Sequence, residues 1–316
     1  MTSADQTRER QITALKRSLG PEIIEYLADP KIVEIMLNPD GSLWVDELGG
    51  EMRHVADLTS IRSRTIVDTV AAMLETVITE DRPILECELP IDGSRFEALI
   101  PPLVAQTTFA LRKKALLVFT LDDYVAKGIM TPRQKEVIEQ AISDRMNILV
   151  VGGTGTGKTT LANAIIDSIS KIDPQHRTVV IEDTRELQVN AKNVVFLRTS
   201  DNTDMTRLLR ATMRLRPDRI IVGEVRDGSA LALLKAWNTG HPGGIGTVHA
   251  NNSEAGLIRI EQLIQEVVTQ PQNKLIAEAV NVVVSIERTA TSRQIKEVMM
   301  VKGWSEQSGY EVEHLV

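Results

Sequence analysis

The sequence predicts an α/β protein in which a parallel sheet carries helices on both faces and a smaller α+β domain precedes it. From residue 147 onward, short apolar runs alternate with runs of helical periodicity, a pattern typical of a parallel sheet. A glycine-rich segment, residues 152–159, separates one apolar run from one helical run and predicts a strand–loop–helix unit. The length of 316 residues agrees with two domains, since a domain averages about 150 residues.

Composition and charge exclude several classes of protein. Hydrophobic residues make up 42% of the chain and charged residues 25%, which is ordinary for a globular protein and argues against long disorder. Cys87 is the single cysteine, so no internal disulfide forms and a reducing compartment is expected. The polar start, Met1–Gln11, is not a secretory signal, and the longest uncharged apolar stretch, residues 98–111, is shorter than the roughly 20 residues that span a bilayer. The net charge of −7 argues against DNA binding over a broad surface.

The first domain, residues 1–125, is predicted to be α+β. Turn chemistry at Asn38-Pro39-Asp40-Gly41 separates two strands, and Ile91-Asp92-Gly93 separates the arms of a hairpin. Apolar residues recur at helical spacing over residues 61–78. The predicted elements, in chain order, are a helix beginning over 21–27, strands over 32–37 and 42–46, the helix over 61–78, the hairpin over 85–89 and 95–100, and a strand over 107–112.

A linker is predicted around Leu121–Gly128, and the second domain covers residues 126–316. Thr131 followed by Pro132 is a strong helix start, because threonine caps the free amides and proline suits the first turn. The alternating elements that follow are strands over 147–151, 178–181, 219–222 and 245–248, helices over 158–169, 205–215 and 229–237, two helical segments after 252, and a late hairpin over 282–287 and 294–301.

The glycine-rich segment fits the pattern G-x-x-x-x-G-K-[ST] of a phosphate-binding loop. Glycines let the backbone wrap closely and aim its N–H groups at phosphate oxygens, and the helix that follows adds a favourable dipole. Lys158 is expected to contact the β- and γ-phosphates, and Thr159 to coordinate Mg²⁺. ATP is the expected substrate. The candidate nucleotide-binding residues are Gly152, Gly153, Thr154, Gly155, Thr156, Gly157, Lys158, Thr159 and Thr160.

Acidic residues follow two apolar strands, where a phosphate loop needs partners for metal and water. Glu224 follows the strand over 219–222, preceded by Gly223 where many such enzymes have Asp. Glu182 and Asp183 follow the strand over 178–181. Acids at strand ends also serve solvation alone. We expect Glu224 or Glu182 to polarise the attacking water, and Thr159, Asp183 and Glu224 to hold Mg²⁺, with Glu224 acting directly or through water.

Two histidines lie in a glycine-rich segment, residues 240–251. Neither His241 nor His249 has cysteine or carboxylate neighbours at the spacing of zinc ligands. His249 ends a predicted strand and is the stronger candidate for a residue that senses the γ-phosphate. A histidine that only stabilises a turn is the alternative.

Together these segments resemble the traffic ATPases of type II and type IV secretion and of pilus assembly. The phosphate loop, residues 181–187 (the aspartate box of that family), 215–226 (its atypical Walker B segment) and 240–251 (its histidine box) match in order. Glycine at the position before this glutamate, Gly223 here, is typical of that family. Residues 29–41, 89–96 and 109–113 match its N-terminal part, so the resemblance spans nearly the whole chain. The length and the single cysteine favour the conjugal-transfer, TrbB-like branch of type IV secretion.

The resemblance implies a RecA-like P-loop ATPase core, residues 126–316, that hydrolyses ATP within a homo-hexameric ring. It implies that Arg95 and Arg112 of the first domain contact phosphate, and that His249, Lys158 and a strand-end carboxylate complete the catalytic set. It also implies a cytoplasmic protein that associates peripherally with the inner membrane through secretion or conjugation channel proteins.

Three alternatives stay open: an ATPase of pilus retraction, pilus assembly or type II secretion; a nucleotide-gated adaptor without motor function; and a DNA-acting translocase. The last would use a basic helix face formed by Arg207, Arg210, Arg214 and Arg216. A solvated or subunit-facing surface explains this face equally, and direct DNA binding is not expected for an acidic chain.

Overall fold

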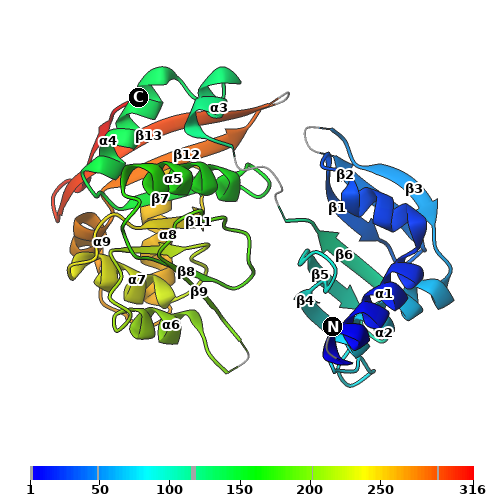
Figure 1. Cartoon of the computed structure of the whole chain (residues 1–316). Helices are drawn as coiled ribbons and strands as arrows, with labels where there is room; N and C mark the ends of the chain where they lie inside the picture. The colour runs from blue at the N-terminus through cyan, green and yellow to red at the C-terminus, as the bar shows by residue number, and fades with distance from the viewer. Residues whose placement is uncertain (1–2, 48–49, 115–118, 201, 290–291) are drawn as a thin grey trace. The chain divides into compact units, whose positions relative to one another are not determined.

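The computed structural model describes residues 3–47, 50–114, 119–200, 202–289 and 292–316. The chain forms two compact units, Met1–Leu116 and Leu117–Val316 (Figure 1). The division falls earlier than the expected boundary after residue 125 because the helix α3 (Leu121–Ala126) belongs to the second unit. Leu121 and Tyr124 of α3 are buried in the core of that unit.

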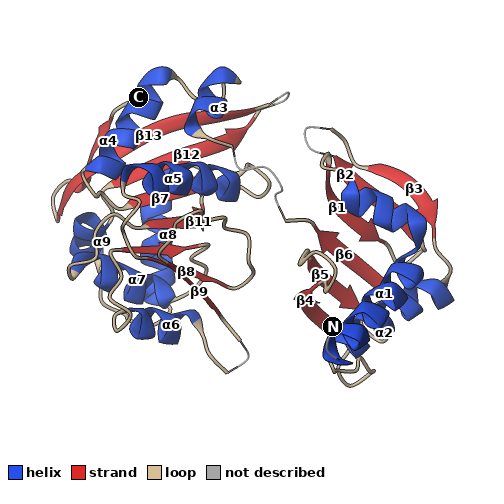
Figure 2. Cartoon of the chain, viewed as in Figure 1, coloured by secondary structure: helices blue, strands red, loops and turns tan. Residues whose placement is uncertain are grey.

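The first unit is an antiparallel sheet with two helices on one face (Figure 2). Its strands lie in the order β3-β2-β1-β6-β5-β4, and every neighbouring pair is antiparallel. The helices bury Leu15, Ile23 and Ile66 against the sheet. The elements are α1 (Ser3–Ala28), β1 (Ile32–Leu37), β2 (Ser42–Glu47), β3 (Arg53–Asp57), α2 (Ser60–Met73), β4 (Ile84–Glu88), β5 (Arg95–Leu99) and β6 (Thr108–Arg112).

The second unit is a sheet in the order β14-β13-β12-β7-β11-β10-β8-β9. Neighbouring strands from β12 to β9 are parallel, whereas β13 and β14 are antiparallel additions at one edge. Strands of this unit are β7 (Ile148–Gly152), β8 (Thr178–Glu182), β9 (Val194–Arg198), β10 (Arg219–Val222), β11 (Ile245–His249), β12 (Val282–Arg288), β13 (Arg293–Ser305) and β14 (Gly309–His314).

Helices cover both faces of this parallel sheet. One core contains residues of α3, α4 and α5, and the other contains residues of α6, α7, α8 and α9. This two-sided burial explains why β7, β8 and β10 are almost uniformly apolar. The arrangement is the RecA-like α/β core that the sequence predicts. The remaining helices are α4 (Pro132–Ser143), α5 (Lys158–Ile172), α6 (Met205–Thr212), α7 (Ser229–Asn238), α8 (Ser253–Gln265) and α9 (Asn273–Ala279).

Local signals place most elements correctly. The hairpin of β4 and β5, the late hairpin of β12 and β13 and the cap of α4 by the Thr131 side chain are all present. The first helix extends back to Ser3, beyond its expected start, and kinks where Gly20 has φ 80° before Pro21. The strands β3, β9 and β14 were not predicted. Among the described residues, no helix is both long enough and apolar enough to cross a bilayer.

Two predicted helices end early for a backbone reason. The helix predicted over 61–78 stops at Met73, and Glu75 then adopts φ 56°. The helix predicted over 205–215 stops at Thr212, and the Arg214 and Leu215 amides then donate to the carbonyls of Ala211 and Thr212 in tight turns. A left-handed residue such as Glu75 directs the chain out of a helix, and glycine adopts this conformation most readily, so the end of α2 has no glycine signal in the sequence.

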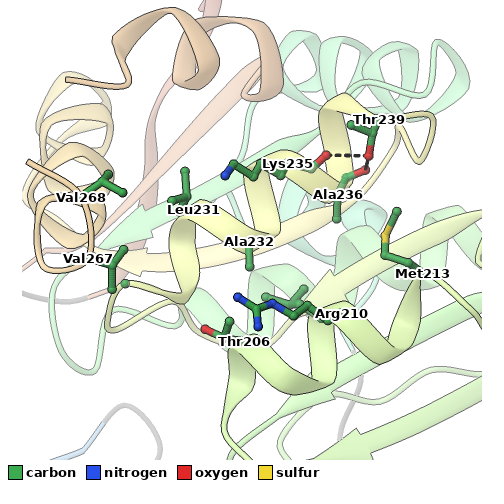
Figure 3. Close-up of a pocket in the computed structure, with 12 residues that line it drawn as sticks. Thr206, Arg210, Met213, Leu231, Ala232, Lys235, Ala236, Thr239, Val267 and Val268 are labelled. Carbon is green, nitrogen blue, oxygen red and sulfur yellow. Dashed lines mark hydrogen bonds between the residues drawn. The ribbon is translucent and has the colours of Figure 1, made fainter. Parts of the chain in front are cut away.

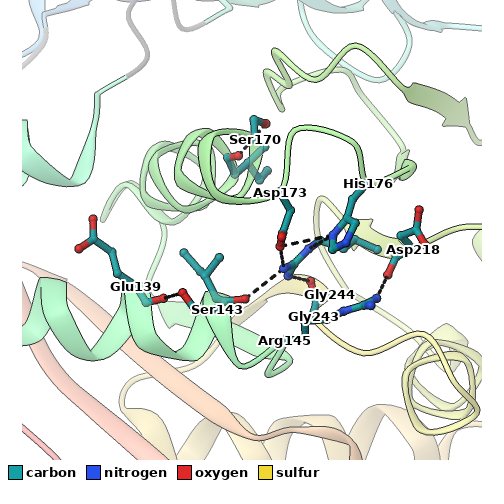
Figure 4. A network of polar contacts seen from close by, with 12 residues as sticks. Glu139, Ser143, Arg145, Ser170, Asp173, His176, Asp218, Gly243 and Gly244 are labelled. Carbon is teal, nitrogen blue, oxygen red and sulfur yellow. Dashed lines mark hydrogen bonds and ion pairs between the residues drawn. The ribbon is translucent and has the colours of Figure 1, made fainter.

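Arg219, the first residue of β10, joins several elements at the amino ends of the parallel strands. Its side chain is completely buried. It donates to the carbonyl of Ile142 at 3.0 Å, to the carbonyl of Gly243 at 2.9 Å and to His176 Nδ1 at 3.2 Å, and it forms an ion pair with Asp173. Asp173, His176 and Gly243 are labelled in the close-up of this network (Figure 4). Burial lowers the pKa of the guanidinium, and Asp173 opposes this change. One cation therefore satisfies groups from α4, the end of α5 and the loop before β11.

We expect Arg219→Leu to lower the free energy of unfolding by about 3 kcal/mol, because it leaves two carbonyls without their donor and removes the guanidinium from the Asp173 carboxylate. Urea unfolding followed by circular dichroism measures this loss. The matched control is Arg133→Leu, since Arg133 is 68% exposed and pairs with Glu136 one turn along its helix. The control should change stability by less than about 0.5 kcal/mol. Equal losses in the two variants would contradict the assigned role of Arg219.

Candidate functional site

The carboxyl ends of four adjacent parallel strands form the edge of the sheet that carries the candidate site. In the order β7-β11-β10-β8, the strands end at or just before Gly152, His249, Glu224 and Glu182. His249 lies directly beside Gly152 in the register of β11 and β7. Ligands of open α/β sheets bind at this edge. The pairing therefore brings together segments that are up to 97 residues apart, as the hydrogen bond from the Gly244 amide to Oδ1 of the Asn147 side chain also shows.

The loop between β7 and α5 has the backbone that close phosphate contact requires. Gly155 and Gly157 have φ angles of 70° and 97°, which glycine adopts without strain. A Cβ atom at Gly152 would lie 2.5 Å from the carbonyl oxygen of Ile286, so no side chain fits there. Gly157 caps the amino end of α5. The loop thus ends at a helix amino terminus, where free N–H groups and the helix dipole attract an anion.

Lys158, His249 and Glu224 form a continuous series of contacts at the mouth of this loop. Lys158 Nζ donates to the carbonyl of Gly153 at 3.0 Å and lies 3.2 Å from His249 Nδ1. His249 Nε2 lies 2.7 Å from Glu224 Oε1. A neutral His249 with its proton on Nε2 satisfies both contacts, since it donates to the carboxylate and accepts from the ammonium. Lys158 is 8% exposed and the Glu224 side chain 18%, so both charges are held at the edge of solvent.

The second oxygen of Glu224 is held by Arg226. Arg226 Nη2 donates to Glu224 Oε2 at 2.6 Å, and its Nη1 lies 4.0 Å from Asp183 Oδ2. Asp183 itself accepts a hydrogen bond from the Thr199 hydroxyl at 2.9 Å. The carboxylate of Glu224 is therefore fixed from two sides while it faces the phosphate loop. Sequence reasoning did not single out Arg226, although it lies within the quoted segment 215–226.

Glu182 has a different environment. Its side chain is 4% exposed, and Oε1 accepts hydrogen bonds from the backbone amides of Glu186 at 2.9 Å and Leu187 at 2.8 Å. Burial raises the pKa of Glu182 to about 7, although the two amide hydrogen bonds oppose the rise. This carboxyl group anchors the loop that follows β8, and none of its contacts involves the phosphate loop.

Gly223 makes room for that buried carboxyl group. A Cβ atom at position 223 would lie 3.0 Å from Cγ of Glu182 and 3.2 Å from its Oε1. An aspartate here would press on Glu182 and would add a second carboxylate beside it. The glycine that replaces the more usual aspartate thus has a steric reason in this chain.

Thr159 meets a carboxylate that sequence reasoning did not select. Its hydroxyl donates to Glu186 Oε2 at 3.1 Å, whereas the contacts of Asp183 are to Thr199 and Arg226. Among the described residues, no three His, Cys, Asp or Glu side chains gather into a metal site. A hydroxyl beside one carboxylate nevertheless fits Mg²⁺, which prefers oxygen ligands and is usually held by one or two protein groups together with substrate phosphates. Glu186 lies inside the quoted segment 181–187, which was the available signal.

The two candidate arginines of the first unit are neighbours in its sheet. Arg112 of β6 lies between Glu34 of β1 and Arg95 of β5 in the strand register. The row lies on the face opposite the helices, because the alternating residues Ile35, Leu111 and Phe96 are buried in the helix-covered core. Burial raises the pKa of Glu34, and Arg112 and Arg95 partly offset the rise. Two guanidinium groups side by side suit a phosphate-rich ligand.

Comparison with known proteins agrees with this architecture. The model of the family "Type II/IV secretion system protein" matches residues 18–311. The chain is 48% identical to the conjugal transfer protein TrbB of Rhizobium radiobacter, over 98% of this chain and 95% of that protein. It is 47% identical to the probable conjugal transfer protein TrbB of Sinorhizobium fredii, over 98% and 94%. The solved structure of the ATPase DotB of Legionella pneumophila shares the fold, with a TM-score of 0.62, 17% identity, and coverage of 86% and 77%.

The fold and the loop define a P-loop protein with a RecA-like core. The family match and the relatives at 47–48% identity place the chain in the type II/IV secretion system family. This family is the one that the sequence segments resemble.

Proposed function

We propose that the chain is an ATP-hydrolysing motor that energises a conjugal type IV secretion system. The observation that carries the proposal is the series of contacts from Lys158 through His249 to Glu224 at the mouth of the phosphate loop. A cation, a histidine and an anchored carboxylate beside a phosphate loop are the groups that nucleotide hydrolysis requires. The names of the relatives, conjugal transfer proteins, support the choice of system.

In this proposal ATP binds with its phosphates on residues 152–160, where glycine backbone, helix terminus and Lys158 supply positive potential. Lys158 exchanges its contacts with Gly153 and His249 for phosphate oxygens, which lets His249 respond to the γ-phosphate. Thr159 and Glu186 are the proposed protein groups for Mg²⁺, with Asp183 and Glu224 as further candidates. When bound, Mg²⁺ neutralises charge on the phosphate oxygens.

We assign the catalytic carboxylate to Glu224. Arg226 and His249 hold one oxygen each, so the group is oriented before the nucleotide arrives. An ionised carboxylate in this position polarises a water molecule for attack on the γ-phosphate. Glu182 instead accepts two backbone amides and is buried, which suits a positioning role in the loop over 183–188.

The proposed assembly is a homo-hexameric ring in the cytoplasm that contacts the inner membrane peripherally through channel proteins of the secretion system. Arg95 and Arg112 are the proposed guanidinium donors to the ATP phosphates. Such groups stabilise the charge that develops during phosphoryl transfer. The chain is not proposed to bind DNA directly, because its net charge is −7.

Replacing Lys158 tests the enzymatic function. We expect Lys158→Ala to lower ATP hydrolysis by the purified full chain at least about 100-fold, because a charged donor to the transferred phosphate is lost. Release of inorganic phosphate measures the rate. Lys171→Ala is the matched control, since Lys171 lies in the same helix and is 62% exposed. Normal turnover by Lys158→Ala would refute the ATPase proposal.

The two carboxylates are separated by a pair of isosteric variants. Glu224→Gln should lower turnover about 100-fold and retain ATP binding, because the amide keeps the shape but cannot accept a proton. Glu182→Gln should stay within about threefold of the parent, because an amide oxygen still accepts the Glu186 and Leu187 amides. Steady-state hydrolysis and binding of a fluorescent nucleotide measure the two effects. The reverse order of losses would transfer the catalytic role to Glu182.

The arginine pair gives a further prediction. Arg112→Ala should lower turnover about 10-fold or more while stability changes little, because Arg112 is exposed on the sheet face without helices. Arg53→Ala provides the comparison, since Arg53 is a half-exposed cation on the same sheet that pairs with Glu47. Hydrolysis and thermal unfolding are measured on both variants. Equal rates for Arg112→Ala and the parent would remove Arg112 from the phosphate site.

A further inference from the structure

A groove runs along the outer surface of the second unit, away from the phosphate loop. It lies between α6, α7 and the residues that follow α8, and its volume is about 470 Å³ (Figure 3). Lining residues recur at helical spacing along α6 and its C-cap (Thr206, Arg210, Met213) and along α7 and its two caps (Gly228, Leu231, Lys235, Thr239). The groove therefore follows both helix axes.

The floor and one wall of the groove are apolar. Leu209, Leu231 and Ala232 line it from α6 and α7, and Val267 closes one end. Val267 is 58% exposed and Met213 is 36% exposed. Gly228 allows this shape, because a Cβ atom there would lie 2.3 Å from Val267 Cγ1. A second apolar surface packed against these side chains would remove exposed apolar area from water.

The charges at the groove are all of one sign. Arg210 and Lys235 line it, both are exposed, and no carboxylate is among the lining residues in the described part of the chain. Exposed Arg207 of α6 and exposed Arg214, two residues after the end of α6, add further positive charge to this part of the chain. Asp227 precedes the groove in sequence, but its carboxylate accepts the Ser229 amide at 2.8 Å. These cations lie together on a chain whose net charge is −7. Charge complementarity therefore favours an acidic binding partner at the groove.

The length and the lining residues of the groove further restrict the class of molecule that fits it. The lining residues of α7 span about 16 Å, at about 1.5 Å per residue, which matches roughly three turns of a helix. No aromatic side chain lines the groove among the described residues, so bases have nothing on which to stack. Apolar side chains with flanking carboxylates would instead meet the apolar floor and the cations at the same time.

We propose that this groove, defined by α6, α7 and Val267–Val268, is the docking site for an amphipathic acidic helix of a partner protein. The helix inserts apolar residues at i, i+3, i+4 and i+7 against Leu231 and Ala232. Its glutamates or aspartates face Arg210 and Lys235. Docking of a helix in this groove is separate from nucleotide binding, so peptide binding can be measured without ATP.

The probe is a fluorescein-labelled peptide of about 15 residues, with leucines on one helical face and glutamates on the other. A peptide with lysine in place of each glutamate is the charge control. Fluorescence anisotropy of the full chain with each peptide gives the affinities. We expect saturable binding of the acidic peptide and binding at least about 10-fold weaker for the lysine peptide.

Two variants locate the binding. Ala232→Trp fills the groove, and Arg210→Glu reverses its charge without adding bulk to the floor. Each should weaken binding of the acidic peptide about 10-fold. Lys274→Glu, the same charge change at an exposed position of α9, should leave binding within about twofold. Circular dichroism verifies folding, and Arg210→Glu decides the result if Ala232→Trp does not fold.

Four outcomes would overturn the proposal. The first is equal affinity for the two peptides, and the second is affinity that neither groove variant changes. The third is a sedimentation coefficient that falls in Ala232→Trp without peptide, because the groove would then be an interface between copies of this chain. The fourth is displacement of the acidic peptide by a DNA duplex whose own binding depends on Arg210, because the surface would then be a nucleic-acid site.

Discussion

Parallel pairing of β7, β11, β10 and β8 is the constraint on which the candidate site depends. The phosphate loop, His249, Glu224 and Glu182 follow different strands, and their order along the sheet edge is the order of those strands. The register places His249 beside Gly152, so the contact from Lys158 to His249 follows from strand pairing. At the opposite ends of the strands, Arg219 joins the elements that hold this alignment.

We propose separate roles for two carboxylates at this edge because their surroundings differ. The Glu224 carboxylate lies near solvent with a cation and a histidine on its two oxygens, which keeps it oriented. The Glu182 carboxyl is buried, its pKa is raised to about 7, and its partners are backbone amides. Gly223 directly precedes Glu224 in the chain, and the Glu182 side chain occupies the space that a side chain at position 223 would need. These different surroundings support the proposal that Glu182 is structural and Glu224 catalytic, although they follow neighbouring strands.

Local pattern predicts the loop, the strand ends and most elements, because glycine spacing and hydrophobic periodicity are properties of neighbouring residues. Long-range packing decides the rest. Glu182 and Glu224 are equivalent as acids near the ends of apolar strands, and their contacts in the fold distinguish them: the loop over 183–188 for Glu182, and Arg226 and His249 for Glu224. Glu186 was missed because its partner Thr159 is 27 residues away in sequence and meets it only in the fold. Arg226 is two residues from its partner Glu224, so that contact is local and the sequence offered a signal for it. The sequence predicts the basic residues of α6 but not the groove, because the groove forms only where α7 packs beside α6.

A crystal structure with Mg²⁺ and a non-hydrolysable ATP analogue would test the assignment of the sheet edge most directly. The account predicts that Lys158 leaves His249 for the phosphates, that Glu224 faces the γ-phosphate, and that Glu182 still accepts the amides of Glu186 and Leu187. A structure in which Glu182 releases those amides and approaches the γ-phosphate, while Glu224 turns away, would contradict it.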